Sequence, residues 1–171
     1  YFKGTPACLS ALYAAGRHED LLNLLDLARY KFWHDRHWGV RALVAQGKNE
    51  AAIRYAEDTR GLNQPDGRIS LACEVILLSE GLWREAYDRY ALEANRQSTY
   101  LATFQALTSK YPQIGPKVIL GDLVDRSPDD AGKWFVAAKS AGLLAEAAEL
   151  ARTSPCDPRA LTRAARDFAA S

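Results

Sequence analysis

Apolar residues recur along the chain three or four positions apart, which is the spacing of amphipathic helices rather than of strands. The clearest stripe lies on one helical face at Trp83, Ala86, Tyr87, Tyr90, Ala91 and Ala94. Two further stripes of this kind are Leu21, Leu24, Leu25, Ala28 and Phe32, and Ala131, Trp134, Phe135, Ala138 and Ala141. Small residues within the stripes allow close approach of helix axes. The pattern predicts an all-α fold.

Prolines mark the expected helix ends, because proline is tolerated in the first turn of a helix and breaks its interior. None of the seven prolines interrupts an apolar periodic segment. Together, periodicity and proline positions predict helices over 6–15, 19–33, 35–46, 49–60, 68–80, 83–95, 98–110, 117–125, 129–141, 143–152 and 158–169.

Four segments of the chain resemble one another around a turn glycine. They cover residues 12–25, 43–56, 77–90 and 138–151, and their glycines are Gly16, Gly47, Gly81 and Gly142. The glycines are separated by 31 residues (16 to 47), 34 (47 to 81) and 61 (81 to 142). The last interval is close to two periods, so we expect a degenerate copy near Lys110. Such a period predicts stacked helix pairs, since each pair leaves an apolar face that only its neighbour can cover.

The pattern of a glycine, an alanine five residues later and an aromatic residue or alanine after four more resembles the tetratricopeptide repeat. One copy is Gly81, Ala86 and Tyr90, and the others are Gly47, Ala52 and Ala56, and Gly142, Ala147 and Ala151. The resemblance covers about residues 3 to 152. It implies a right-handed superhelix of about five antiparallel helix hairpins, forming a single helical-repeat domain over 1–171. A general α-solenoid of helix pairs is the alternative.

In the tetratricopeptide geometry, the first helix of each pair lines a concave face. The resemblance places three sets of residues there, namely His34, His37 and Arg41; Arg68, Leu71 and Val75; and, if Lys110 replaces the glycine, Gln97, Tyr100 and Phe104. Cationic groups beside apolar and aromatic side chains suit an acidic or C-terminal peptide. We therefore expect a non-catalytic protein interaction module whose binding residues are His34, His37, Arg41, Arg68, Gln97 and Tyr100.

Charge leaves a second hypothesis open. The 22 Lys and Arg residues against 21 Asp and Glu give a net charge of +1, which excludes a global electrostatic argument for nucleic acid. Local basic segments exist at 29–41 and 159–166, with the cations Arg29, Lys31, Arg36, Arg41, Arg159, Arg163 and Arg166. They make a nucleic-acid-binding helical repeat the alternative function, and solvated helix faces are the simpler explanation of the same charges.

Catalytic, metal and membrane chemistry find little support in the sequence. The chain has only three histidines, and His34 and His37 lack two further ligands at a zinc spacing. Cys8, Cys73 and Cys156 are far apart, so we expect reduced and mostly buried thiols. No apolar run reaches the length of a membrane span. We thus expect no enzymatic activity, no metal or other cofactor, and a cytoplasmic location. The start at Tyr1 and the absence of Met suggest a fragment of a longer chain.

Overall fold

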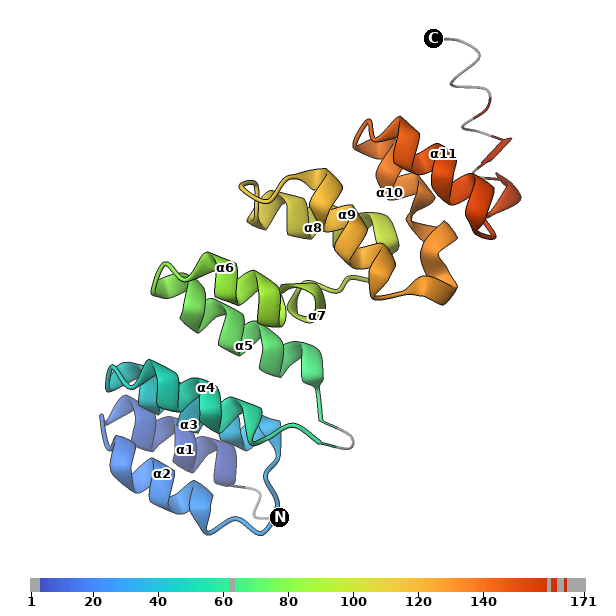
Figure 1. Cartoon of the computed structure of the whole chain (residues 1–171). Coiled ribbons are helices and arrows are strands. Elements are labelled where there is room, and N and C mark those ends of the chain that lie inside the picture. The colour runs from blue at the N-terminus through green and yellow to red at the C-terminus, as the bar shows by residue number, and fades with distance from the viewer. Residues whose placement is uncertain (1–3, 62–63, 160, 163–164, 166–171) are drawn as a thin grey trace. The chain divides into compact units, whose positions relative to one another are not determined.

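The computed structural model describes residues 4–61, 64–159, 161–162 and 165 (Figure 1). Every regular element in these described ranges is a helix, so the all-α prediction is confirmed. The chain divides into two compact units, Tyr1–Ala94 and Asn95–Ser171, and each is described by itself.

The first unit is a series of helices that pack mainly on their neighbours in the chain. The helices α1, α2 and α3 contact one another, α4 packs against both α3 and α5, and α5 packs against the segment 83–94. Their bounds are α1 Thr5–Ala14, α2 His18–Asp26, α3 Trp33–Ala45, α4 Asn49–Glu57, α5 Asp66–Ser79, α6 Trp83–Ala86, the π-helical turn η1 Tyr87–Ala91, and α7 Leu92–Ala94.

The second unit contains α8 Tyr100–Lys110, α9 Pro116–Asp125, the 3-10 helix η2 Pro128–Trp134, α10 Phe135–Ser140 and α11 Leu144–Thr153. Helix α8 contacts α9 and α10, and α11 packs against both η2 and α10. In the predicted helix 158–169, the described residues 158–159, 161–162 and 165 are helical. The remaining part, which includes Arg163 and Arg166, lies outside the described residues.

The four predicted turn glycines share one backbone conformation. Gly16, Gly47, Gly81 and Gly142 have φ values of 69°, 72°, 76° and 72°. At the first turn, the Gly16 N–H donates to the carbonyl of Tyr13 and the Arg17 N–H to that of Leu12; the same two bonds recur at the other three glycines. This Schellman motif ends a helix with a left-handed residue, which glycine adopts without steric cost. The four similar segments therefore turn identically.

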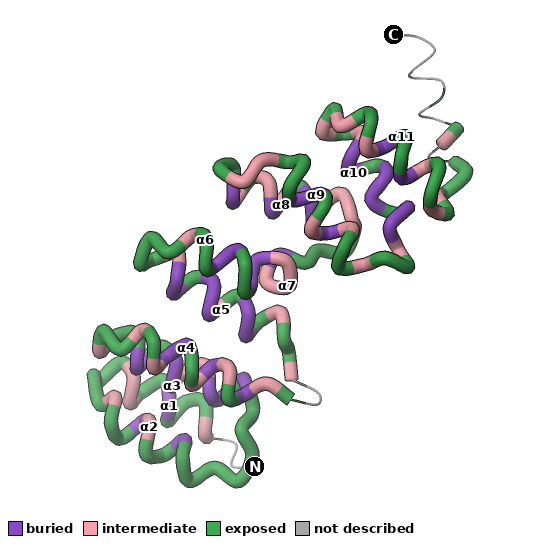
Figure 2. The backbone as a smooth tube through the Cα atoms, viewed as in Figure 1, coloured by how far each residue is buried: buried purple, intermediate pink, exposed green. Residues whose placement is uncertain are grey.

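Burial follows the same register in all four segments. The residues five positions after each glycine are fully buried, with no exposed surface at Leu21, Ala52, Ala86 and Ala147. Most of the predicted stripe over 83–94 is buried too, and it packs on α5 (Figure 2). The predicted stripe over 21–32 is buried only at Leu21 and Leu25, whereas Leu24 and Ala28 are exposed, so the prediction of a continuous buried stripe is wrong there.

One predicted helix is wrong at its end. The segment 19–33 is helical only to Asp26, and residues 27–32 connect α2 to α3. Trp33 instead begins α3, where its side chain is buried in the core. Its backbone N–H donates to the side-chain oxygen of Gln64 at 3.3 Å. Because this burial forces the chain out of α2, Phe32 does not continue the apolar stripe and is 41% exposed.

The degenerate copy also differs from its expected form. Lys110 does not replace the turn glycine, because it lies within α8; the positive φ of 83° belongs to Gly115, which precedes α9. Phe104, expected on the open face, is 3% exposed. Tyr111, the residue after α8, is fully buried where this longer turn begins. The residue positions predicted by aligning Lys110 with the turn glycines are therefore wrong.

Candidate functional site

A groove of about 750 Å³ lies within the first unit, between α3 and α5. Helix α4 packs against both of these helices, and Tyr13 of α1 also lines the groove. Its lining residues are Tyr13, Trp33, His34, His37, Val40, Arg41, Val44, Ala45, Arg68, Leu71, Ala72, Val75 and Ile76.

The floor of the groove is apolar and partly open to solvent. Val40 and Ile76 are buried, whereas Val44, Leu71 and Val75 are 38%, 42% and 54% exposed. Large aliphatic side chains gathered in one exposed hollow are typical of a surface that binds another molecule. Leu71 and Val75 lie one turn apart on α5, as the resemblance implies for an outward-facing row.

Four of the six predicted binding residues line this groove. His34, His37 and Arg41 follow one face of α3, and Arg68 lies in the first turn of α5. The lining residues include no carboxylate. Among the residues that the structure describes, neither Arg41 nor Arg68 has a carboxylate oxygen within 4.0 Å. Within the described part of the chain, no carboxylate therefore neutralises the charges of Arg41 and Arg68.

The Arg41 guanidinium lies against two aromatic rings that also contact each other. The centre of its guanidinium lies 4.4 Å from the ring centroid of Tyr13 and 4.7 Å from that of Trp38. The centroid of the His37 ring lies 4.9 Å from that of Trp38, and the buried His37 Nδ1 has no hydrogen-bond partner among the described residues. Sequence reasoning assigned no role to Tyr13, because it lies 28 positions before Arg41 and reaches it only through the packing of α1 on α3.

The other two predicted binding residues belong to the second unit and do not line the groove. Gln97 precedes α8, and its backbone N–H donates to the Thr103 hydroxyl at 2.9 Å. Tyr100 begins α8, and its hydroxyl donates to Asp130 at 2.7 Å. Its ring meets Trp134 edge-on, with 4.7 Å between centroids. Tyr100 thus contributes to packing and polar contacts inside its own unit.

The basic segment 29–41 is less available than its sequence suggests. Asp58 accepts from Lys31 at 2.5 Å and from Arg36 at 3.2 Å, and the hydrogen bond from Lys31 lowers the pKa of Asp58. Arg36 is only 4% exposed, and its guanidinium lies 3.5 Å from the Tyr55 ring centroid. The expectation that Arg36 adds to a basic surface is therefore wrong, because its charge is used to join α3 to α4.

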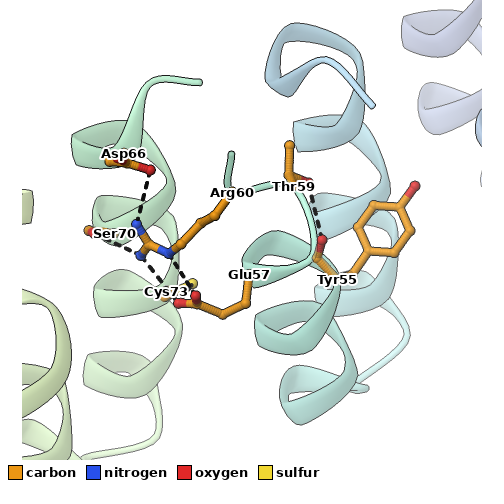
Figure 3. A network of polar contacts seen from close by, with 7 residues as sticks. All are labelled: Tyr55, Glu57, Thr59, Arg60, Asp66, Ser70 and Cys73. Carbon is orange, nitrogen blue, oxygen red and sulfur yellow. Dashed lines mark hydrogen bonds and ion pairs between the residues drawn. The ribbon is translucent and has the colours of Figure 1, made fainter. Parts of the chain in front are cut away.

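A second polar network joins α4 to α5 (Figure 3). The Arg60 guanidinium donates to Glu57 at 2.6 Å and to the Ser70 hydroxyl at 2.9 Å, and it lies 3.4 Å from Asp66. Burial opposes ionisation of Glu57, but hydrogen bonding from Arg60 and Tyr90 and the charges of Arg60 and Arg89 together outweigh it and lower the pKa of that carboxyl. The groups satisfy one another, so the network serves as a structural link between two helices.

The three cysteines are free and differ in burial. Cys73 is fully buried, and burial raises the pKa of its thiol to about 11, which keeps it protonated at neutral pH. Cys156 is half-buried and donates weakly to the Leu150 carbonyl. Cys8 is exposed, so the prediction of burial is wrong there. It lies on α1, a helix that covers its neighbours mainly through Leu9.

Other candidate sites are weaker. A hollow of about 450 Å³ lies between α9 and α11 in the second unit, but its Lys117 and Glu146 pair with each other at 2.6 Å. Within the described ranges, no group of three or more His, Cys, Asp or Glu side chains could hold a metal ion. None of the described helices is both long and apolar enough to cross a membrane.

Comparisons with known proteins identify no relative. No family model, no curated protein and no solved structure matches the chain. The likeness to tetratricopeptide repeats therefore depends on the four glycine-centred segments and on their common turn geometry.

Proposed function

We propose that this chain is a non-catalytic protein interaction module that binds an acidic peptide or protein segment in the groove between α3 and α5. The observation that carries the proposal is the combination of the exposed apolar floor with Arg41 and Arg68, which have no carboxylate within ion-pair distance among the described residues. An acidic segment with aliphatic side chains would neutralise the cations and cover the floor in one binding event.

The proposal includes a tetratricopeptide-like architecture, in which about five antiparallel helix hairpins stack into a right-handed superhelix. The four identical glycine turns and the equivalent buried positions support it. In such a stack, the face lined by the first helix of each pair serves as the binding surface, and α3 and α5 are these first helices. We further expect such a module, with three free thiols, to work in the cytoplasm.

Nucleic-acid binding receives less support. Binding of phosphates requires several exposed cations along one surface, and its affinity falls steeply with salt. In the segment 29–41, Lys31 and Arg36 are already paired with Asp58. Because the groove floor is aliphatic and the net charge is only +1, a peptide is the better fit.

A peptide-display selection with random dodecamers on the intact chain tests this function. We expect enrichment of peptides that combine Asp or Glu with Leu, Ile, Val or Phe. The affinity of the enriched peptides should fall at least about tenfold in the double variant His37→Glu, Arg41→Glu, since each substitution places a negative charge beside the ligand. Arg54→Glu is the matched control, because Arg54 is an exposed arginine on α4 that does not line the groove.

Two outcomes would overturn the proposal. Failure to enrich any peptide would argue against the interaction function itself, and equal affinity of the enriched peptides for the double variant would argue against the groove. Labelled single- and double-stranded DNA titrated at two salt concentrations tests the alternative. Tight binding that weakens steeply with salt would favour a nucleic-acid partner.

A further inference from the structure

Arg41 is oriented before any ligand arrives. Tyr13 and Trp38 lie within 4.4 and 4.7 Å of the guanidinium centre, and their ring centroids are 5.7 Å apart with planes inclined by 54°. Cation–π contact with two rings fixes a side chain that otherwise has many rotamers. Because the Arg41 side chain is already ordered, binding of a ligand to it costs less side-chain conformational entropy than binding to a mobile arginine.

The N–H groups of this guanidinium remain available for hydrogen bonds to a ligand. Arg41 is exposed and lines the groove. Within the described part of the chain, its guanidinium has no hydrogen bond or ion pair. A planar guanidinium donates two parallel N–H bonds to a carboxylate, which an ammonium group cannot do. Arg68 differs, because it lies in the first turn of α5 without a contact to an aromatic ring among the described residues.

The place of Arg41 along α3 indicates which carboxylate it takes. His34 and His37 line the groove toward the N-terminal end of α3, and Val44 and Ala45 line it toward the C-terminal end. A group bound at Arg41 thus has groove on both sides. This placement fits an acidic side chain inside a peptide better than a chain terminus, and Val75 and Leu71 lie across the groove to take the aliphatic residues beside it.

We propose that Arg41, oriented by its contacts with Tyr13 and Trp38, is the specificity-determining residue of the groove and recognises an internal Asp or Glu flanked by aliphatic residues in an extended partner segment. Tyr13 and Trp38 act as positioning residues that hold the guanidinium, and Arg68 adds charge without selecting geometry. This inference rests on the function proposed above and adds the chemistry of the residue that the groove selects.

Binding of defined peptide pools to the intact chain, measured by fluorescence anisotropy, tests the proposal. Each pool consists of N-acetylated, C-amidated nonapeptides with Leu, Ile, Val or Ser at the flanking positions and one fixed central residue, namely Glu, Asp, Gln, Asn or phosphoserine. We expect the Glu and Asp pools to bind at least about tenfold more tightly than their amide counterparts, because a charge-assisted bidentate pair is lost with the amide.

The variants separate orientation from charge. Arg41→Lys keeps the charge but not the planar fork, so it should reduce binding of the acidic pools about tenfold or more and leave the amide pools nearly unchanged. Tyr13→Leu and Trp38→Leu should have the same selective effect, whereas Tyr13→Phe, which retains the ring face, should bind like the wild type. Arg54→Lys is the matched control, because Arg54 is an exposed arginine on α4 that does not line the groove, and its expected change is below about threefold. Circular dichroism melts establish that each variant is folded.

The possible failures are distinguishable. If no pool binds, the proposed function is wrong and this inference is wrong with it. If all pools bind equally, peptide binding in the groove stands and recognition by Arg41 is overturned. Tighter binding of the phosphoserine pool, full binding by Arg41→Lys, or a requirement for a free C-terminal carboxylate in a parallel unamidated pool would each overturn the internal carboxylate as the selected group.

Discussion

Arg36 and Arg41 are two arginines of one helix, one buried in an ion pair and the other exposed in the groove. They are five positions apart on α3, which separates their directions by about 140° around the helix axis. Arg36 faces α4, where it is buried, pairs with the exposed Asp58 and lies over the Tyr55 ring. Arg41 lines the groove, and among the described residues its side chain has contacts with two rings but no hydrogen bond or ion pair. Charge counting along the sequence treats both as surface cations and therefore overestimates the basic patch.

Thiol reactivity checks burial at single residues. At pH 8, a thiol whose pKa is about 11 is ionised to only about one part in a thousand. We expect Cys8 to react with a chromogenic disulfide reagent in the native protein, and Cys73 to react only after denaturation. Cys8→Ser should remove the fast phase. Rapid reaction of the folded chain with both Cys8 and Cys156 replaced by Ser would contradict the burial of Cys73.

Gly39 is a residue at which even one methyl group does not fit. A Cβ added there would lie 2.6 Å from Cε1 of Tyr55, which packs against α3 from α4. Gly39→Ala should therefore lower the free energy of unfolding by about 1–3 kcal/mol in a urea titration.

Gly121→Ala is the matched control for Gly39→Ala. It is also a helical position, on α9, but the added methyl group meets open space. The gain in helix propensity should raise the free energy of unfolding by about 0.5–1 kcal/mol. Equal signs for the two substitutions would argue against the close packing of Tyr55 on Gly39.

At the scale of elements, the repeated turns are set by glycine. Gly81→Val should cost about 1–2 kcal/mol of folding free energy, because a β-branched residue is strained at its φ of 76°. Gly61→Val is the comparison, since Gly61 is exposed, has open space for a side chain and has no positive φ. Urea unfolding of both variants measures the difference, and a Gly81→Val variant as stable as Gly61→Val would contradict the turn geometry.

The link between α4 and α5 should give the chain an acid-sensitive component of stability. The pKa of Glu57 lies below its ordinary value of 4.5 in the folded chain, so its stabilising contribution is complete above that pH and is lost as the pH falls through the folded pKa. Thermal midpoints measured between about pH 5 and pH 3 should fall less steeply for Glu57→Gln than for the wild type. Parallel curves would show that the Arg60 network does not carry this dependence.

That each element is a helix was predictable, because it follows from the spacing of apolar residues. The exact helix ends and the π-helical and 3-10 segments were not. The sequence analysis predicts helices at every described helical segment, since period and proline positions are local properties. It misses the end of α2 at Asp26, the π-helical turn over Tyr87–Ala91 and the 3-10 helix over Pro128–Trp134. These depend on packing: Trp33 enters the core, and the aromatic residues Tyr87, Tyr90 and Trp134 are buried against neighbouring elements.

At the scale of the whole molecule, the first unit has a core of its own. One buried cluster joins α3, α4, α5 and the segment 83–94, and a second joins α1, α2 and α3. We therefore expect residues 1–94, expressed alone, to give a helical circular dichroism spectrum and a cooperative thermal transition. Because helical repeats draw their stability from neighbouring pairs, a fragment without this transition would show that the core needs residues beyond 94.

The candidate site was predictable only in part, for a reason that belongs to the whole chain. His34, His37, Arg41 and Arg68 come from helices in regular register, so a repeat alignment places them on one face. Gln97 and Tyr100 were placed through Lys110, where that register does not hold. The contacts of the Arg41 guanidinium with Tyr13 and Trp38 join residues from α1 and α3, and no local pattern in the sequence predicts such contacts.

The sequence by itself determined that the chain is helical, where four of its glycine turns fall and which face is buried in the helices that follow those glycines, because backbone propensity and apolar spacing act within a few residues. Only the tertiary structure decided which charges are used internally, as with Arg36 and Asp58, and which remain open, as with Arg41. Those outcomes depend on distances between side chains of different helices, which packing sets and the order of residues along one helix does not.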